Sequence, residues 1–352
     1  MPFLDGHRQT GYASPVMSAP ASTPQHWQTR GLIAVLLLPI AALYAAIAAL
    51  RRGAYRCGLL RSQRPGVPVI IVGNITVGGT GKTPLTLWLT QFLAAQGRHP
   101  GIISRGYGAA RSDPRGVPLN GTARDYGDEP CLLAQRTGCP VWVGTDRAAT
   151  ARALRAAHPD IDLIISDDGL QHYRLARDFE IAVIDGTRGL GNGWPLPAGP
   201  LREPASRLAT VDAVVVNGNG ESAYTYPQAL AMRLAGHEFR NLLNPQQVVQ
   251  AGHFHGQKVH AVAGIGNPAR FFAQLQRLGL DCTTHAFPDH HAYSAVDLQF
   301  AGADHIVMTE KDAVKCSTFA TERHWALVVN VTIDEQLGTM ILARLAQARH
   351  HG

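Results

Sequence analysis

The chain has 352 residues, of which 45% are apolar, enough to fill the cores of about two domains of ordinary size. Its formal net charge of +6 favours anionic partners such as nucleotides or phospholipid headgroups. The arginines are dispersed and lack interleaved aromatic residues, so we expect no nucleic-acid partner. Five cysteines without a Cys-x-x-Cys pair argue against a disulfide framework and against a zinc site.

The N-terminal segment changes character near residue 31. Residues 1–30 form a polar extension, whereas residues 31–50 contain no charged side chain and are long enough to cross a bilayer as a transmembrane helix. A signal peptide and a buried core helix remain alternatives for 31–50. Five arginines follow the stretch, namely Arg51, Arg52, Arg56, Arg61 and Arg64. This positive-inside bias predicts a single span of the inner (cytoplasmic) membrane, with the rest of the chain facing the cytoplasm.

Residues 67–93 have the pattern of a strand, a glycine-rich loop and a helix. The loop and the helix start contain Thr76, Gly78, Gly79, Thr80, Gly81, Lys82 and Thr83. Such glycines let backbone N–H groups surround phosphate oxygens, while Lys82 can reach a terminal phosphate and Thr83 can offer its hydroxyl to Mg²⁺. The pattern predicts a P-loop that binds a nucleotide, although Thr76 stands where the usual motif has glycine. A glycine-rich turn capped by a lysine is the alternative.

Short apolar runs alternate with helical stretches, which is typical of a doubly wound α/β domain with mainly parallel strands. Strands are predicted within 67–74, 100–108, 139–144, 161–169, 179–186 and 211–218, and helices near 83–96, 130–137 and 146–157. We predict a nucleotide-binding domain over 51–220, an extended linker over 221–250 and a smaller α/β domain over 251–352 that ends in a helix near 334–349.

Charged residues follow two of the predicted strands. Asp167 and Asp168 come directly after an apolar run, as does the carboxylate that holds Mg²⁺ beside a P-loop, although a helix-capping pair is the alternative. Arg105 follows the strand near 100–104, where it can neutralise phosphate or serve as an ordinary turn arginine.

Three other groups are ambiguous from the sequence alone. Asp128 and Glu129 precede Pro130 and an apolar helix, which is typical of a helix N-terminus. Arg202 with Glu203, and the stretch Asp289-His290-His291, carry no motif that is specific in isolation.

Seven stretches together resemble one family. VGNITVGGTGKTP, SRGYG, GDEP, DDGLQH, LPAGPLREP, FPDHH and TEKDAVK occur in the order and approximate spacing of tetraacyldisaccharide 4′-kinase, the lipid A kinase of Gram-negative bacteria. The resemblance covers residues from about 30 to 345, and Thr76 fits this family's own version of the loop. Leu170 and Tyr173 depart from it, because they stand where an aromatic and a basic residue are expected.

The resemblance implies an enzyme that uses ATP and Mg²⁺ to phosphorylate the 4′-hydroxyl of a tetraacylated glucosamine disaccharide 1-phosphate at the cytoplasmic membrane surface. It also implies two α/β/α lobes joined by a β-ribbon, with a P-loop NTPase core. The alternative from another class is a membrane-tethered P-loop ATPase that acts as a switch or chaperone. That alternative needs a metal-ligand cluster or a partner-binding switch, and the sequence shows neither.

The resemblance also implies roles for single residues. Asp128 and His290 form the pair that activates the sugar hydroxyl, and Lys82 acts on the phosphate. The metal set implied by the resemblance is Thr83, Asp167, Asp168 and Glu203. The acceptor-binding set is Asn74, Arg105, Glu129 and His172.

Overall fold

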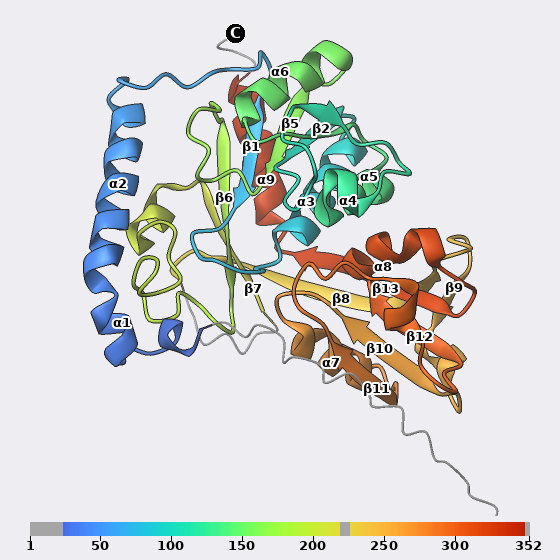
Figure 1. The fold of residues 1–352 in the computed structure, drawn as a ribbon. Coiled ribbons are helices and arrows are strands. Elements are labelled where there is room, and N and C mark those ends of the chain that lie inside the picture. Colours follow the sequence, from blue (N-terminus) through green and yellow to red (C-terminus); the bar gives the residue numbers. More distant parts are fainter. Residues whose placement is uncertain (1–23, 219–225, 349–352) are drawn as a thin grey trace, which may run out of the picture.

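The computed structural model describes residues 24–218 and 226–348, so parts of the predicted N-terminal extension, of the linker and of the C-terminal helix lie outside it (Figure 1). The first half of the sheet surrounds β1 (Val69–Gly73), which lies between β5 (Leu163–Asp167) and β6 (Phe179–Asp185). The flanking strands are β2 (Pro100–Ser104), β4 (Val141–Val143), β3 (Arg115–Gly116) and β7 (Ala213–Asn217). All of these strands except β3 are parallel, which confirms the predicted mainly parallel α/β sheet.

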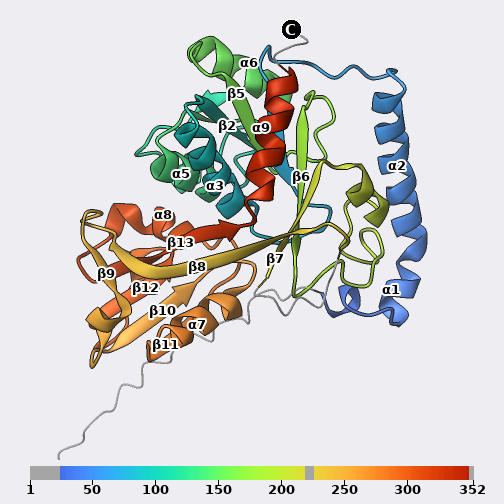
Figure 2. The same cartoon turned by 180° about the vertical axis from the view of Figure 1, so that it is seen from behind.

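Helices cover both faces of this first half because its strands are apolar on both sides. One face carries α3 (Lys82–Ala95) and α9 (Gln336–Ala348), whose leucines share a core with alternate residues of β1. α6 (Arg147–Ala157) packs against the other face. α5 (Asp128–Thr137) lies next to α3 and follows the short α4 (Ala123–Tyr126), as Figures 1 and 2 show.

The second half of the sheet begins with β8 (Leu230–Asn241), which pairs in parallel with β7 and antiparallel with β13 (His324–Ile333). The strands beyond them are β12 (His305–Thr309), β10 (Val259–Ala263), β11 (Cys282–Ala286) and the short β9 (Val248–Gln250). Its helices are α7 (Pro268–Arg277) and α8 (Glu310–Cys316). One continuous sheet therefore runs through both halves, and Figure 2 shows β8 crossing between them.

The prediction of a membrane-spanning helix over 31–50 is wrong. The apolar stretch is divided between α1 (Leu32–Leu36) and α2 (Leu38–Arg56), with Pro39 in the first turn of α2. The second helix then runs on past residue 50 into three arginines. Within residues 24–218 and 226–348, no helix has the length and apolar character needed to cross a bilayer. The predicted location in the inner membrane through a single N-terminal span is therefore contradicted as well.

The contact between α9 and α3 yields a test of the core. A side-chain carbon at Gly338 of α9 would lie 2.6 Å from Cζ of Phe92, whose ring stacks on Trp88 with centroids 5.2 Å apart. Overpacking costs about 1–3 kcal/mol, whereas replacing glycine by alanine in a helix gains about 1 kcal/mol. We therefore expect Gly338→Ala to lower the free energy of unfolding, as measured by urea denaturation.

Gly53→Ala in α2 is the matched control, because a side-chain carbon there meets no atom within 4 Å. This variant should be neutral or slightly more stable than the wild type. Equal stability changes in the two variants would show that α9 does not pack tightly on α3.

Candidate functional site

The P-loop lies between the end of β1 and the start of α3. Gly78 and Gly81 have φ angles of 103° and 96°, in the left-handed region that glycine adopts without strain. The Asn217 side chain at the end of β7 donates from Nδ2 to the Thr80 carbonyl at 3.0 Å. A side-chain carbon at Gly81 would lie 2.4 Å from that Nδ2, so glycine is needed here for close packing as well as for backbone shape.

Two acidic residues meet the P-loop because β5 runs parallel to β1 and ends at the same edge of the sheet. Lys82 Nζ lies 3.5 Å from Oδ1 of Asp168, and Thr86 Oγ1 donates to Oδ1 of Asp167 at 3.1 Å. The second oxygen of Asp167 is buried and has no hydrogen-bond partner among the described residues. Complete burial, reinforced by Glu129, raises the pKa of Asp167 to about 7.

Asp128 and His290 come together from distant parts of the chain. Asp128 is the first residue of α5 and is 5% exposed, while His290 follows β11 and has a φ of 60°. His290 Nδ1 lies 3.0 Å from Asp128 Oδ2, across 162 positions of sequence. The helix cap is Gly127, but Asp128 Oδ1 also accepts the backbone N–H of Glu129 at 2.9 Å, so the side chain contacts the helix start as well as His290.

The two side chains shift each other's ionisation. Burial acts to raise the pKa of Asp128, but the hydrogen bond to His290 and the charge of Lys311 outweigh it, so this pKa lies below its usual value. The same hydrogen bond raises the pKa of His290 against the opposing effect of burial. The arrangement therefore favours an ionised carboxylate beside an imidazolium.

Lys311 of α8 joins this group. Its Nζ lies 3.2 Å from Glu129 Oε1, 3.7 Å from Asp289 Oδ1 and 3.8 Å from Asp128 Oδ2. Burial acts to lower the pKa of Lys311, but the three carboxylates raise it overall. Lys311 thus neutralises charge between α5 of the first half and α8 of the second.

Glu203 has neighbours of a different kind. Its Oε1 accepts from Gln171 Nε2 at 2.8 Å, and its Oε2 accepts from the Tyr173 hydroxyl. Oε2 also lies 3.6 Å from Arg52 of α2 and 3.5 Å from Arg207 Nε. Both oxygens are therefore occupied by neutral and basic side chains of the protein.

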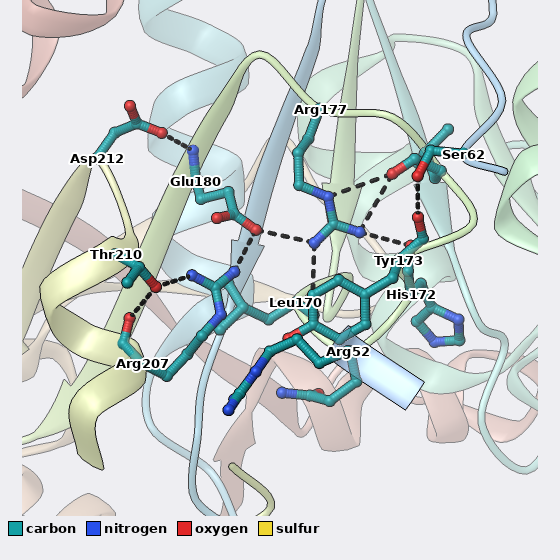
Figure 3. A network of polar contacts seen from close by, with 12 residues as sticks. Arg52, Ser62, Leu170, His172, Tyr173, Arg177, Glu180, Arg207, Thr210 and Asp212 are labelled. Atoms are coloured by element: carbon teal, nitrogen blue, oxygen red, sulfur yellow. Dashed lines mark hydrogen bonds and ion pairs between the residues drawn. The ribbon is translucent and has the colours of Figure 1, made fainter. Parts of the chain in front are cut away.

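The surroundings of this carboxylate form a larger polar network. Figure 3 shows Arg177 and Arg207 converging on Glu180, with Arg52 and Tyr173 nearby. Tyr173, which departs from the family pattern in the sequence, thereby contributes a hydroxyl to the Glu203 site.

The other predicted site residues lie around the same edge. Asn74 is buried and donates from Nδ2 to the Gly78 carbonyl at 3.2 Å, and Gln171 donates to the Asn74 carbonyl at 2.9 Å. Arg105 is exposed after β2. Burial and the nearby Arg147 lower the pKa of His172 to about 4, which keeps its ring neutral.

The predicted metal set is not gathered around one point. In the part of the chain that the structure describes, no three His, Cys, Asp or Glu side chains form a group suited to hold a metal ion. The unpartnered oxygen of Asp167 nevertheless fits a cation, because a buried carboxylate oxygen without a donor otherwise costs free energy. Mg²⁺ commonly takes only one or two carboxylates and completes its shell with waters and substrate phosphates.

Comparison with known proteins decides the family. The family model described as tetraacyldisaccharide-1-P 4′-kinase matches residues 33–346. The chain belongs to the tetraacyldisaccharide-1-P 4′-kinase family. This membership confirms the resemblance drawn from the seven sequence stretches.

Individual members of the tetraacyldisaccharide-1-P 4′-kinase family are similar over nearly their full length. A tetraacyldisaccharide 4′-kinase of Azoarcus sp. is 51% identical over 93% of this chain and 96% of its own. Another, of Methylobacillus flagellatus, is 52% identical over 89% and 92%. A solved "apo" form of LpxK from Aquifex aeolicus in complex with ATP has a TM-score of 0.77 and 28% identity, covering 89% of this chain and all of that one.

Sequence reasoning about this kinase-family chain missed several residues that the fold brings to the site. Asn217 is the last residue of a buried strand. A polar residue at that position could have predicted a contact with the site. Lys311 belongs to the recognised TEKDAVK stretch but was given no role of its own. Gln171 was also missed, because only tertiary structure places it between Asn74 and Glu203.

The Asp128–His290 pair predicts a pH-dependent contribution to stability. The raised pKa of His290 means that the stabilisation is complete below about pH 6.5 and is lost as the pH rises through the folded-state pKa. The lowered pKa of Asp128 means that it is present above about pH 4 and is lost at more acidic pH. The difference in melting temperature between wild type and His290→Ala should therefore be greatest between about pH 4 and 6.5.

The exposed His99 makes no side-chain hydrogen bond among the described residues, and His99→Ala is the control. Its melting-temperature difference should stay small and flat across the same range. A difference for His290→Ala that does not change with pH would rule out an ionic pair.

Proposed function

We propose that this protein transfers the γ-phosphate of ATP to the 4′-hydroxyl of a tetraacylated glucosamine disaccharide 1-phosphate. The observation that carries the proposal is the Asp128–His290 pair, with Nδ1 and Oδ2 3.0 Å apart, assembled from both halves of a P-loop protein. The family model and the two relatives, all named for this kinase activity, support the acceptor. The ATP in the Aquifex aeolicus structure supports the donor.

Asp128 serves as the general base in this mechanism. A carboxylate with a lowered pKa is ionised at neutral pH and can accept the proton of the 4′-hydroxyl as the oxygen attacks the γ-phosphorus. His290 orients that carboxylate and stabilises its charge through the 3.0 Å hydrogen bond. Lys82 stabilises the negative charge on the migrating phosphoryl group, and the bond to the ADP oxygen breaks.

We place Mg²⁺ next to Thr83 and Asp167, with Asp168 close by. The unpartnered Asp167 oxygen supports this position, and the metal, when bound, supplies charge neutralisation for the phosphates. Glu203 is left out of this set because its oxygens already bind Gln171, Tyr173 and basic side chains.

The acceptor is proposed to lie over the same edge of the sheet. The four predicted acceptor-binding residues lie in loops or helix starts of the first half, namely Asn74, Arg105, Glu129 and His172. The exposed Arg105 is the member best suited to bind a phosphate of the acceptor, because arginine recognises phosphate through paired donors. We assign nucleotide binding to residues 51–220 and closure of the acceptor site to 251–352, as two lobes bridged by β8 and β13.

We also propose that the protein meets its lipid acceptor on a phospholipid surface. Ala34 and Ala41 of α1 and α2 are buried, but large apolar residues of these helices face outward, with Leu43, Ile47 and Leu50 exposed by 63%, 58% and 74%. These three residues lie on one side of α2 at helical spacing, and arginines follow them at 51, 52 and 56. A helix with such a face rests in the interfacial layer of a bilayer rather than crossing it.

The proposed base can be tested by a double-mutant cycle. Asp128→Asn should lower the turnover number by about 10² to 10⁴, the usual contribution of general-base catalysis. His290→Ala should add little to the loss in the Asp128→Asn background, because residues that act as one unit are not additive. Turnover is measured with saturating Mg-ATP and the tetraacyl disaccharide 1-phosphate.

Near-normal turnover in Asp128→Asn would remove this residue from the chemistry. Losses that simply multiply in the double variant would show that His290 acts independently of Asp128, for example on phosphate.

The surface of α2 gives a separate prediction. Replacing Leu43, Ile47 and Leu50 together by glutamine should weaken cosedimentation with anionic phospholipid vesicles, because the apolar surface that enters the bilayer is removed. The affinity for Mg-ATP should stay unchanged. Leu243→Gln, at a residue 57% exposed outside these helices, is the control and should bind vesicles as the wild type does. Unaltered vesicle binding of the triple variant would place the lipid contact elsewhere.

A further inference from the structure

Residues 264–269, with the sequence GIGNPA, have no role in the mechanism above, yet this stretch lies against the P-loop. It forms the turn between β10 and α7, in the second half of the sheet. A side-chain carbon at Gly266 of this turn would lie 3.6 Å from the backbone nitrogen of Gly79. The turn therefore approaches the part of the loop whose N–H groups are expected to face phosphate.

Arg270 extends from the first turn of α7 toward the same place. Its Nη2 donates to Asn217 Oδ1 at 2.9 Å, and Asn217 Nδ2 in turn donates to the Thr80 carbonyl at 3.0 Å. This side-chain bond uses one of the five guanidinium N–H donors. Arg270 thus contacts the P-loop indirectly, through the side chain of Asn217.

Arg188 approaches the loop from the first half. It follows β6, and its Nη2 donates to the Gly79 carbonyl. Its Nη1 lies 2.8 Å from where a side-chain carbon at Gly78 would stand, so a glycine at 78 leaves room for this guanidinium. The two arginines accordingly reach the loop from different elements, one after β6 and one in α7.

Arg188 has a paired carboxylate, whereas Arg270 has none in the part of the chain that the structure describes. No carboxylate of the described residues lies within 4.0 Å of the Arg270 guanidinium, although the side chain is half-buried. Burial lowers the pKa of Arg270, and the neighbouring Arg277 and Arg188 lower it further against the attraction of Asp185. Arg188 pairs with Asp185 Oδ2 at 3.4 Å, while Oδ1 of the same carboxylate accepts the backbone N–H groups of Thr187 and Arg188.

A half-buried cation without a matching carboxylate costs free energy unless an anion accompanies it. The P-loop next to these side chains is built to receive such an anion. We propose that Arg188 and Arg270 form an arginine clamp, one residue from each half of the sheet, that binds the phosphate chain of the nucleotide in the P-loop. This inference rests on the proposed nucleotide-binding function and adds to it two binding residues and a role for the GIGNPA turn.

The clamp would also place a residue of the second half of the sheet in contact with the nucleotide. Arg270 belongs to α7, whereas the P-loop belongs to the first half. An anion shared by the two arginines gives the two halves a common ligand. Paired N–H donors of arginine suit phosphate oxygens better than a single ammonium does.

The test measures how tightly Mg-ATP binds when each arginine is replaced. At position 270 it also separates the effect of the charge from that of the hydrogen bonds. Mg-ATP is titrated calorimetrically into wild type, Arg188→Gln, Arg270→Gln and Arg270→Lys, with Lys82→Ala as a reference for loss of phosphate contacts. Each glutamine variant should bind Mg-ATP about tenfold or more weakly, as expected for loss of a charge-assisted hydrogen bond. Arg270→Lys should bind Mg-ATP more tightly than Arg270→Gln, because lysine keeps the charge.

Arg277→Gln is the matched control, since Arg277 is exposed on the same helix and donates only to the Ala273 carbonyl within its own helix. It should bind Mg-ATP as the wild type does. Melting temperatures identify any variant that fails to fold. If Arg270→Gln does not fold, the Mg-ATP affinities of Arg188→Gln and Arg270→Lys are compared with that of the wild type instead.

Two results would overturn the clamp. One is Mg-ATP affinity within twofold of wild type in both glutamine variants. The other is that Arg270→Gln binds Mg-ATP as tightly as Arg270→Lys or more tightly. Because glutamine can still donate to Asn217, this result would show that residue 270 only positions Asn217 and does not bind phosphate. Failure of the kinase proposal is distinguishable, because wild-type protein would then bind Mg-ATP without phosphorylating the acceptor.

Discussion

The assembly of the site depends on β8, which belongs to both halves of the sheet. Its first residues pair in parallel with β7, and most of its length pairs antiparallel with β13. Because hydrogen bonds fix both registers, the second half cannot shift along the first without breaking the sheet. This constraint holds the segment that carries His290 against the start of α5, and so brings Nδ1 within 3.0 Å of Asp128.

Charge compensation is the second condition for that contact. Three carboxylates, of Asp128, Glu129 and Asp289, lie within 4 Å of Lys311. Without this ammonium group, a 5%-exposed carboxylate such as Asp128 would be driven toward its neutral form by burial. Lys311 and His290 therefore keep ionised the carboxylate that we propose as the general base.

The sequence predicted what local patterns control. The strands near β1, β5 and β6, the P-loop and the order of the motifs follow from apolar periodicity and from glycine positions, and the structure has them at the expected places. The break at Leu37 was not predicted, since apolar composition alone does not distinguish one long helix from two. The surroundings of Glu203 were not predictable either, because Arg52 and Arg207 reach it only in the folded chain.

These surroundings link α2 to the phosphate loop. Arg52 of α2 lies 3.6 Å from Glu203, and the Tyr44 hydroxyl of the same helix donates to the Arg202 carbonyl at 3.2 Å. The backbone N–H of Arg202 in turn donates to the Ile75 carbonyl at 2.7 Å, directly before the P-loop glycines. The helix with the exposed apolar face and the loop proposed to hold ATP are therefore attached to one short segment. The proposed lipid surface, by orienting α2, would orient the phosphate donor with it. This arrangement suits the proposed acceptor, whose acyl chains would stay in the bilayer while its sugar hydroxyl reaches the γ-phosphate.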